Sequence, residues 1–186
     1  HSAPHGAPRA AAPAGPAGPA GPIGDLLEGV SRTFALTIPE LPSGLREAVS
    51  TGYLLCRIAD TIEDEPALGS DERRGLHAAF AAAVAGEADG REFGAALLPR
   101  LSDATSAAER ELVRRAPDVI AAARALGASQ RRALERCVAV MCSGMDRFQP
   151  GAGPRGLADL RELDAYCYAV AGVVGEMLTE LFCASA

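Results

Sequence analysis

The stretch YLLCRIADTIEDEP, residues 53–66, begins as an apolar helical segment and ends in a run of carboxylates. Four of its polar and aromatic residues recur at spacings that place them on one stripe of a helix: Tyr53, Arg57, Asp60 and Asp64. The aliphatic residues Leu55, Ile58 and Ile62 occupy the opposite side. Because the C-terminal end of a helix carries a partial negative charge, carboxylates are mildly disfavoured there. The stretch therefore predicts a core helix whose acidic end either has a further role or is simply solvated.

Two interpretations of the acidic end use the same geometry. In the simpler one, the charged stripe faces solvent and Arg57 pairs with Asp60, three residues later. In the other, Asp60 and Asp64 present oxygens to a shared Mg²⁺ ion, which takes further ligands from water and a substrate phosphate. Arg57, one turn earlier, would grip the same phosphate through two hydrogen bonds. That arrangement is suited to ionising an allylic diphosphate.

Helical signals continue on both sides of this stretch, and the alternating apolar pattern of strands is absent. The predicted helices cover, to within a few residues, 23–36, 43–65, 71–85, 106–126, 130–148 and 159–186. Pro117 either kinks the fourth of these or starts a second helix. The segment 149–156 is predicted to be a loop. Helices joined by short connections predict an all-α fold.

Composition limits the class of protein. Residues 1–22 are nearly all Ala, Pro and Gly and are predicted to form a flexible tail, which leaves 23–186 as one domain. The formal net charge of −6 offers no basic surface for nucleic acid. No uncharged apolar run reaches the roughly 18 residues of a membrane span, and there is no secretory signal pattern. We therefore expect a soluble, cytoplasmic protein.

The cysteines point to the same compartment. They form no CxxC pair and lie within apolar helical stretches, at Cys56, Cys137, Cys142, Cys167 and Cys183. Such cysteines are expected to be buried thiols in a reducing compartment.

Three further stretches are unusual. SRTF (31–34) places two hydroxyls and an arginine ahead of the acidic helix, although residues of this kind near a helix end are usually caps. MCSGM (141–145) sets Met141 and Met145 one turn apart around a glycine, a pattern that is also typical of core filling.

The third stretch, YCYAVAGVVGEMLTELF (166–182), contains two glycines inside a predicted helix. Gly172 and Gly175 each cost about 1 kcal/mol relative to Ala, so we expect close approach of a backbone or ligand to offset this. Three residues share a predicted face at i, i+4 and i+8: Tyr166, Val170 and Val174. Tight helix–helix packing is the alternative interpretation.

Taken in order, these segments resemble the squalene/phytoene synthase family, and within it the squalene synthase-like enzymes. The matching pieces are SRTF, YLLCRIADTIED, the M-x-x-G-M of 141–145, YCYAVAGVVG and LTELF. The form DTIED favours the squalene branch over the phytoene branch.

The resemblance implies an isoprenoid synthase-type helical bundle with a central cavity. In it, two molecules of farnesyl diphosphate would condense head to head through presqualene diphosphate, and NADPH would reduce this intermediate to squalene. Mg²⁺ would be bound by Asp60, Glu63 and Asp64. The implied catalytic residues are Tyr166, which would face the carbocation, with Asp60, Asp64 and Arg57. The implied substrate-binding residues are Ser31, Arg32, Thr33, Phe34, Tyr53, Arg57, Met141, Met145, Val170 and Val174.

Several alternatives stay open at this point. One alternative is a phytoene- or dehydrosqualene-type synthase; a phytoene synthase would use geranylgeranyl diphosphate without NADPH. A second is an enzyme that stops at presqualene diphosphate. A third is a non-catalytic family member that acts as a scaffold protein. The resemblance also implies a second Asp-rich helix beyond Ala186. We therefore expect 23–186 to be an N-terminal portion, inactive alone, with an exposed wall at 170–175; missing residues or an inactive homologue are the alternatives. The lipophilic product suggests peripheral membrane association.

Overall fold

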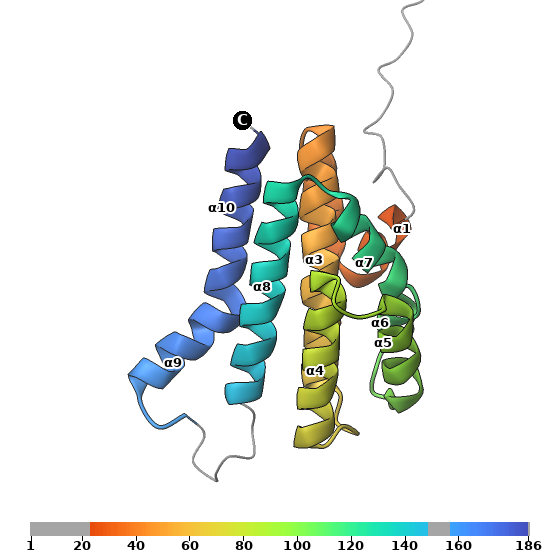
Figure 1. Ribbon diagram of the computed structural model, residues 1–186, viewed down its shortest axis with the longest axis vertical. Coiled ribbons are helices and arrows are strands. Elements are labelled where there is room, and N and C mark those ends of the chain that lie inside the picture. The colour runs from red at the N-terminus through yellow and green to blue at the C-terminus, as the bar shows by residue number, and fades with distance from the viewer. Residues whose placement is uncertain (1–22, 149–156, 186) are drawn as a thin grey trace, which may run out of the picture.

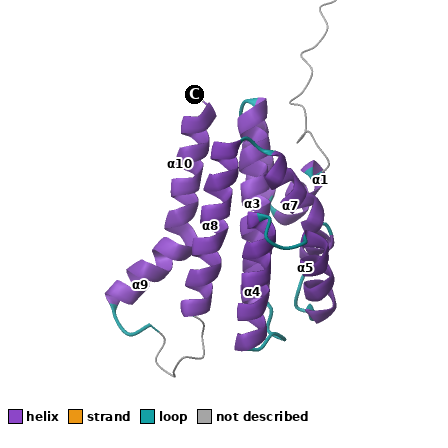
Figure 2. Ribbon diagram, viewed as in Figure 1, coloured by secondary structure: helices purple, strands orange, loops and turns teal. Residues whose placement is uncertain are grey.

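The computed structural model describes residues 23–148 and 157–185. For Arg32 it describes the backbone but not the side chain. Throughout these residues the regular elements are helices, without strands, as Figure 2 shows. The all-α fold class is therefore confirmed. The predicted tail (1–22) and the predicted loop (149–156) lie outside the described residues.

The elements follow one another in a simple order. They are α1 (Gly24–Val30), α2 (Arg32–Thr37), the 3₁₀ turn η1 (Ile38–Glu40), α3 (Ser43–Asp64), α4 (Ser70–Ala85), α5 (Gly90–Leu97), the 3₁₀ turn η2 (Leu98–Arg100), α6 (Ala107–Arg114), α7 (Ala116–Ala125), α8 (Ala128–Arg147), α9 (Leu160–Cys167), the π-helical η3 (Tyr168–Gly172) and α10 (Val173–Ser185). The long helices α3, α4, α8 and α10 pack together, and α5, α6 and α7 lie beside α3 and α4 (Figure 1).

The central helix of this bundle is α3. Its aliphatic side, formed by Leu55, Ile58 and Ile62, is fully buried, as predicted. Burying a side chain of this size contributes about 1.5–3 kcal/mol, so this side anchors the helix in the core. The predicted stripe lies on the other side, where Arg57 and Asp60 are half-buried and Asp64 is exposed. The core therefore holds the acidic stripe in a defined direction.

The structure differs from the predicted helices at two places and settles the open alternative at a third. The predicted helix 23–36 breaks at Ser31, which is extended and caps α2 by accepting a hydrogen bond from the Phe34 amide at 3.1 Å. Pro117 lies in the first turn of α7 and therefore starts a second helix. The short helix α5 was not predicted; Asp89 caps it, and Phe93 packs on Phe80 with ring centroids 5.0 Å apart.

A π-helical turn joins α9 to α10. It covers residues 168–172, between Tyr166 and Val174, so the α-helical spacing that predicted a shared face is interrupted. Val170 and Val174 are half-buried against the core. Tyr166 is also half-buried and meets the Phe148 ring edge-on at 5.9 Å. The widened turn coincides with a bend that sets α9 at an angle to α10 (Figure 1).

The close approach predicted for Gly172 and Gly175 occurs at Gly144 instead. A Cβ added at Gly144 would lie well inside van der Waals contact of the Cβ of Ala169, in the π turn. At Gly175 an added Cβ would meet open space, and at Gly172 it would meet only the ring of Tyr168, one turn earlier. The glycine that permits helix packing is therefore the one in the MCSGM segment.

Several large apolar side chains of α9, η3 and α10 are exposed. The exposed large apolar residues of this part are Leu160, Leu163, Tyr168 and Phe182. Ala171, Gly172 and Gly175 are exposed as well, whereas Val173 is buried and Val170 and Val174 are half-buried, so the predicted wall at 170–175 is exposed only in part.

By length and composition, the continuous helix Leu160–Ser185 could cross a membrane. Only 22% of its most apolar window is buried inside the structure. The expectation that no segment is apolar enough to span a membrane was wrong. It required an uninterrupted run of uncharged residues, whereas a spanning helix tolerates one or two acidic residues. Core helices of soluble proteins share this composition, so it does not by itself assign a location.

The cysteines are free, and the expectation that they are all buried is only partly correct. Cys56, Cys137 and Cys142 are buried between α3 and α8, whereas Cys167 and Cys183 are exposed.

Candidate functional site

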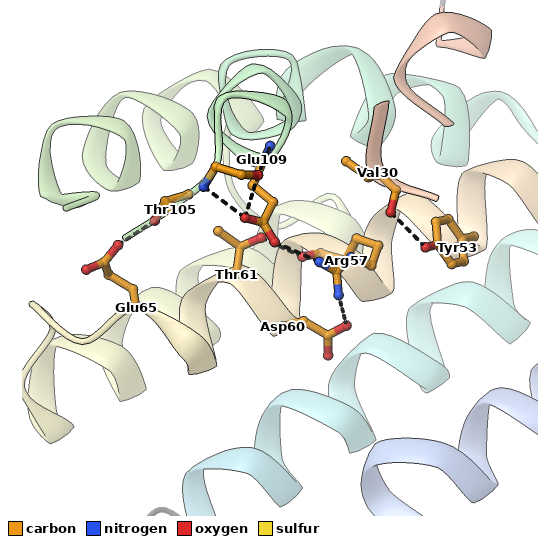
Figure 3. A network of polar contacts seen from close by, with 9 residues as sticks. Val30, Tyr53, Arg57, Asp60, Thr61, Glu65, Thr105 and Glu109 are labelled. Atoms are coloured by element: carbon orange, nitrogen blue, oxygen red, sulfur yellow. Dashed lines mark hydrogen bonds and ion pairs between the residues drawn. The ribbon is translucent and has the colours of Figure 1, made fainter. Parts of the chain in front are cut away.

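The centre of the site is the guanidinium of Arg57. Its Nη1 donates to Asp60 at 3.2 Å, which confirms the predicted pair on α3. Its Nη2 donates to Oε1 of Glu109 on α6 at 2.7 Å, a contact that spans 52 residues of sequence. Figure 3 shows the guanidinium held between these two carboxylates. The arginine and Asp60 side chains are 27% and 29% exposed, so both can still reach a ligand.

The carboxylates at the end of α3 are crowded. Burial raises the pKa of the Asp60 carboxyl, the Arg57 guanidinium opposes this rise, and the charge of Asp64 adds to it. Burial, and then the charges of Asp64 and Asp60, also raise the pKa of Glu63. Since these carboxylates repel one another, a bound cation would reduce the electrostatic repulsion between them. We call Asp60, Glu63 and Asp64 the acidic cluster.

Tyr166 of α9 lies close enough to the acidic cluster to sense its charge. Burial, and then the negative charges of Glu63, Asp64 and Asp60, raise the pKa of its hydroxyl. A phenol with a raised pKa stays neutral near pH 7. Tertiary packing therefore brings together the two ends of the predicted site, which lie about a hundred residues apart in sequence.

A buried histidine supports another carboxylate near the cluster. His77 of α4 is fully buried, and its Nδ1 lies 2.6 Å from Oδ1 of Asp146 on α8. Its Nε2 lies 3.4 Å from the carbonyl oxygen of Ala59. The charge of Asp146 contributes to the raised pKa of Glu63, so Asp146 borders the cluster. The sequence interpretation missed this pair, because nothing local links residues of α4 and α8.

The comparison with known families decides the identity of this fold. The family model "Squalene/phytoene synthase" matches residues 27–186. The chain belongs to the squalene/phytoene synthase family. The squalene synthase of Schizosaccharomyces pombe is 30% identical over 163 residues, which cover 86% of this chain and 34% of that protein. The squalene synthase of Solanum lycopersicum is 32% identical over 160 residues, 86% of this chain and 35% of that protein.

Solved structures agree with this assignment. A structure of TcSQS in complex with a ligand matches with a TM-score of 0.70 and 28% identity, over 87% of this chain and 43% of that chain. This squalene/phytoene synthase chain thus spans about a third of the length of the curated relatives it matches.

The predicted substrate-binding residues of this family member divide into two groups. Near Arg57, the Phe34 and Tyr53 rings pack at 4.9 Å, and the Tyr53 hydroxyl donates to the carbonyl of Val30 at 3.3 Å. The hydroxyl of Ser31 serves as the α2 cap, and Thr33 is exposed. The side chain of Arg32 lies outside the described residues. These residues hold α1 and α2 beside the start of the acidic stripe.

The second group lies in or on the core. Met141 and Met145 are buried, as the core-filling interpretation predicted. Val170 and Val174 are half-buried beside them on the neighbouring helix. A prenyl-binding cavity bounded by these residues stays a prediction.

The acidic cluster is not a closed metal cage. Within the described residues, no group of three or more His, Cys, Asp or Glu side chains is arranged to hold a metal ion by itself. Mg²⁺ usually binds one or two carboxylates and completes its shell with water and substrate phosphates. The hard oxygen donors of Asp60, Glu63 and Asp64 fit that open mode.

The next carboxylate, Glu65, has a structural role that the sequence interpretation missed. It is buried and accepts hydrogen bonds from Ala67 N and Ser102 N, each at 2.9 Å, and from Thr105 Oγ1 at 2.6 Å. Burial would raise the pKa of this carboxyl, but the hydrogen bonds from Ser102, Thr105 and Ala67 outweigh it and lower the pKa to about 2. Glu65 therefore ties the end of α3 to the turn that precedes α6 (Figure 3).

We expect Glu65→Gln to lower the free energy of unfolding by about 1–3 kcal/mol near pH 7, because an amide cannot accept all three hydrogen bonds. The folded pKa lies below the unfolded value of 4.5, so the carboxylate stabilises the fold above pH 4.5. That stability is lost as the pH falls through about 2. Urea unfolding near pH 7 and near pH 2 would measure the difference in the free energy of unfolding between Glu65→Gln and the unaltered chain. The exposed Glu87→Gln is the control, and a difference that persists at the acid end would contradict the assignment.

Proposed function

We propose that this chain forms part of a squalene synthase-like active site. In the complete enzyme, two molecules of farnesyl diphosphate would condense head to head through presqualene diphosphate to squalene. The observation that carries the proposal is that Arg57 pairs with Asp60 of the acidic cluster, while Tyr166 lies near enough for the charges of this cluster to raise the pKa of its hydroxyl. The squalene synthases that match this chain at about 30% identity support it.

The described residues have distinct roles in the proposed ionisation step. Asp60, Glu63 and Asp64 would hold Mg²⁺, which when bound neutralises charge on a departing diphosphate. Arg57 would donate through Nη1 to a diphosphate oxygen, a charge-assisted hydrogen bond of guanidinium to phosphate. Because burial and mutual repulsion already disfavour the charged carboxylates, cation binding and diphosphate binding should strengthen each other.

Tyr166 would act on the carbocation left by the departing diphosphate. A phenol is neutral near pH 7, and the raised pKa of Tyr166 disfavours the phenolate further, so it would present a ring face or a hydroxyl lone pair. Val170 and Val174, which follow it on the same helical run, would exclude water from the cation. In the complete enzyme, NADPH would supply the hydride for the later reduction of presqualene diphosphate to squalene.

Two features of the proposal concern the product and its location. A phytoene-type enzyme acting on geranylgeranyl diphosphate is the second candidate, because the family model covers both activities. The chain is proposed to be cytoplasmic, with peripheral membrane contact through its lipophilic product and the exposed apolar side chains of α9, η3 and α10.

The test is to incubate two proteins with Mg²⁺, NADPH and either prenyl diphosphate, and to analyse the lipid extracts. The protein from the complete reading frame is expected to convert farnesyl diphosphate to squalene and, without NADPH, to accumulate presqualene diphosphate. The 186-residue chain alone is expected to form neither. Phytoene from geranylgeranyl diphosphate would favour the second candidate. Absence of any condensation product from the complete protein would overturn the proposal, and squalene from the chain alone would show that no further acidic helix is needed.

A further inference from the structure

Glu109 is held more firmly than the other partner of Arg57. One carboxylate oxygen accepts from Arg57, while the other accepts from the amide and the hydroxyl of Ser106 at 3.1 and 2.7 Å. The Ser106 hydroxyl in turn accepts from the Glu109 amide at 3.3 Å. This reciprocal capping box fixes the carboxylate at the start of α6.

Asp60 is the less committed partner. It lies on the same helix as Arg57, three residues later, and belongs to the acidic cluster that would take a cation. The Arg57 Nε is buried and has no hydrogen-bond partner among the described residues, so the Nη atoms carry the polar contacts of this guanidinium. If a ligand displaced Asp60 from Nη1, Nη2 would therefore still be hydrogen-bonded to Glu109 on α6.

We propose that Glu109 is a positioning residue, which holds Nη2 of Arg57 on α6 so that Nη1 stays directed at the acidic cluster. There an incoming diphosphate replaces Asp60 as the partner of Nη1, while Asp60 turns to the cation. This inference rests on the proposed function. Glu109 itself touches no substrate and acts only through Arg57.

Positioning and simple electrostatics predict opposite results. Glu109 carries a negative charge next to the proposed anion site, so on Coulombic grounds its removal should strengthen diphosphate binding. If Glu109 positions Arg57, its removal weakens binding, because the guanidinium is then free to turn fully onto Asp60. Gln replaces one of the two carboxylate oxygens by an NH₂ donor, so its carbonyl oxygen can take the position that faces Ser106 or the one that faces Arg57, but not both.

The experiment measures binding of inorganic diphosphate with Mg²⁺ to the 186-residue chain by calorimetry. Glu109→Gln is expected to weaken binding roughly tenfold, the scale of a charge-assisted hydrogen bond, and Arg57→Ala at least as much. The double variant should bind no more weakly than Arg57→Ala, since Glu109 acts through the arginine. Glu111→Gln is the matched control: Glu111 lies on the same helix, its side chain is 44% exposed, and it pairs with Arg114.

A second readout follows the arginine directly. In ¹⁵N NMR spectra, the Nη signals of Arg57 should show restricted rotation in the unaltered chain and in Glu111→Gln, and lose it in Glu109→Gln. Glu109→Asp, which keeps the charge with a shorter reach, should restore binding in part.

Unchanged or tighter diphosphate binding by Glu109→Gln would overturn the inference, as would a further loss in the double variant. Binding that needs Arg57 but not Glu109 would overturn the inference alone. If the unaltered chain bound no diphosphate, the proposed site and this inference would both be overturned.

Discussion

Replacing Asp60 by Asn is expected to lower turnover of farnesyl diphosphate at least about 100-fold in the protein from the complete reading frame. Asn keeps the size of the side chain but removes the charge that would hold Mg²⁺. It also withdraws the charge that Arg57 Nη1 contacts at 3.2 Å in the absence of ligand. The measurement is turnover as a function of Mg²⁺ concentration, together with Mg²⁺-dependent diphosphate binding by the 186-residue chain.

The matched control for this prediction is Asp71→Asn. Asp71 lies in the first turn of α4, is 95% exposed and pairs with Arg74 on the same helix. Its replacement should leave turnover and Mg²⁺ dependence unchanged. An Asp60→Asn variant with the same Mg²⁺ dependence as the unaltered protein would rule out Asp60 as a metal ligand and leave the solvated-stripe interpretation of α3.

Gly144→Ala is expected to lower the free energy of unfolding by about 1–3 kcal/mol, although Ala is the better helix former. The added Cβ would overlap the Cβ of Ala169, and neither atom belongs to a flexible side chain that can move away. The helices must separate instead, which shifts the π turn and, two residues before it, Tyr166. Thermal unfolding should show a midpoint lower by about 2–8 °C.

Gly175→Ala provides the comparison. It makes the same change on α10, where an added Cβ meets nothing within 4 Å. Stability should stay unchanged or rise by up to about 1 kcal/mol, because Ala loses less backbone entropy than Gly in a helix. Equal effects at both glycines would mean that the contact between α8 and the π turn does not limit stability.

Local patterns in the sequence were sufficient for the helices and for one stripe of the site. The 3.6-residue period of Leu55, Ile58 and Ile62 determined which side of α3 is buried, and the i, i+3 spacing determined the Arg57–Asp60 pair. These are contacts between residues a turn apart, which helix geometry alone brings together. The short helix α5 was missed because eight residues offer little periodicity to detect.

Tertiary structure decided the rest of the site. Arg57 meets Glu109 across 52 residues, and His77 meets Asp146 across 69. The Ser106–Glu109 spacing is a recognisable capping box, but it predicts only where α6 begins. Glu65 follows directly after the acidic cluster in sequence yet turns into a buried hydrogen-bond network. No local period distinguishes it from Asp64, because its partners come from the turn before α6.

The sequence by itself therefore determined the all-α class, the buried side of α3 and the position of the acidic stripe on its other side, since each depends on neighbours within a few residues. Only the packed bundle decided that Tyr166 lies near the acidic cluster and that Gly144 is the glycine of close approach. It also decided which carboxylate anchors Arg57. The physical reason is that these contacts join helices whose relative placement depends on the whole core, and no spacing along one helix encodes that placement.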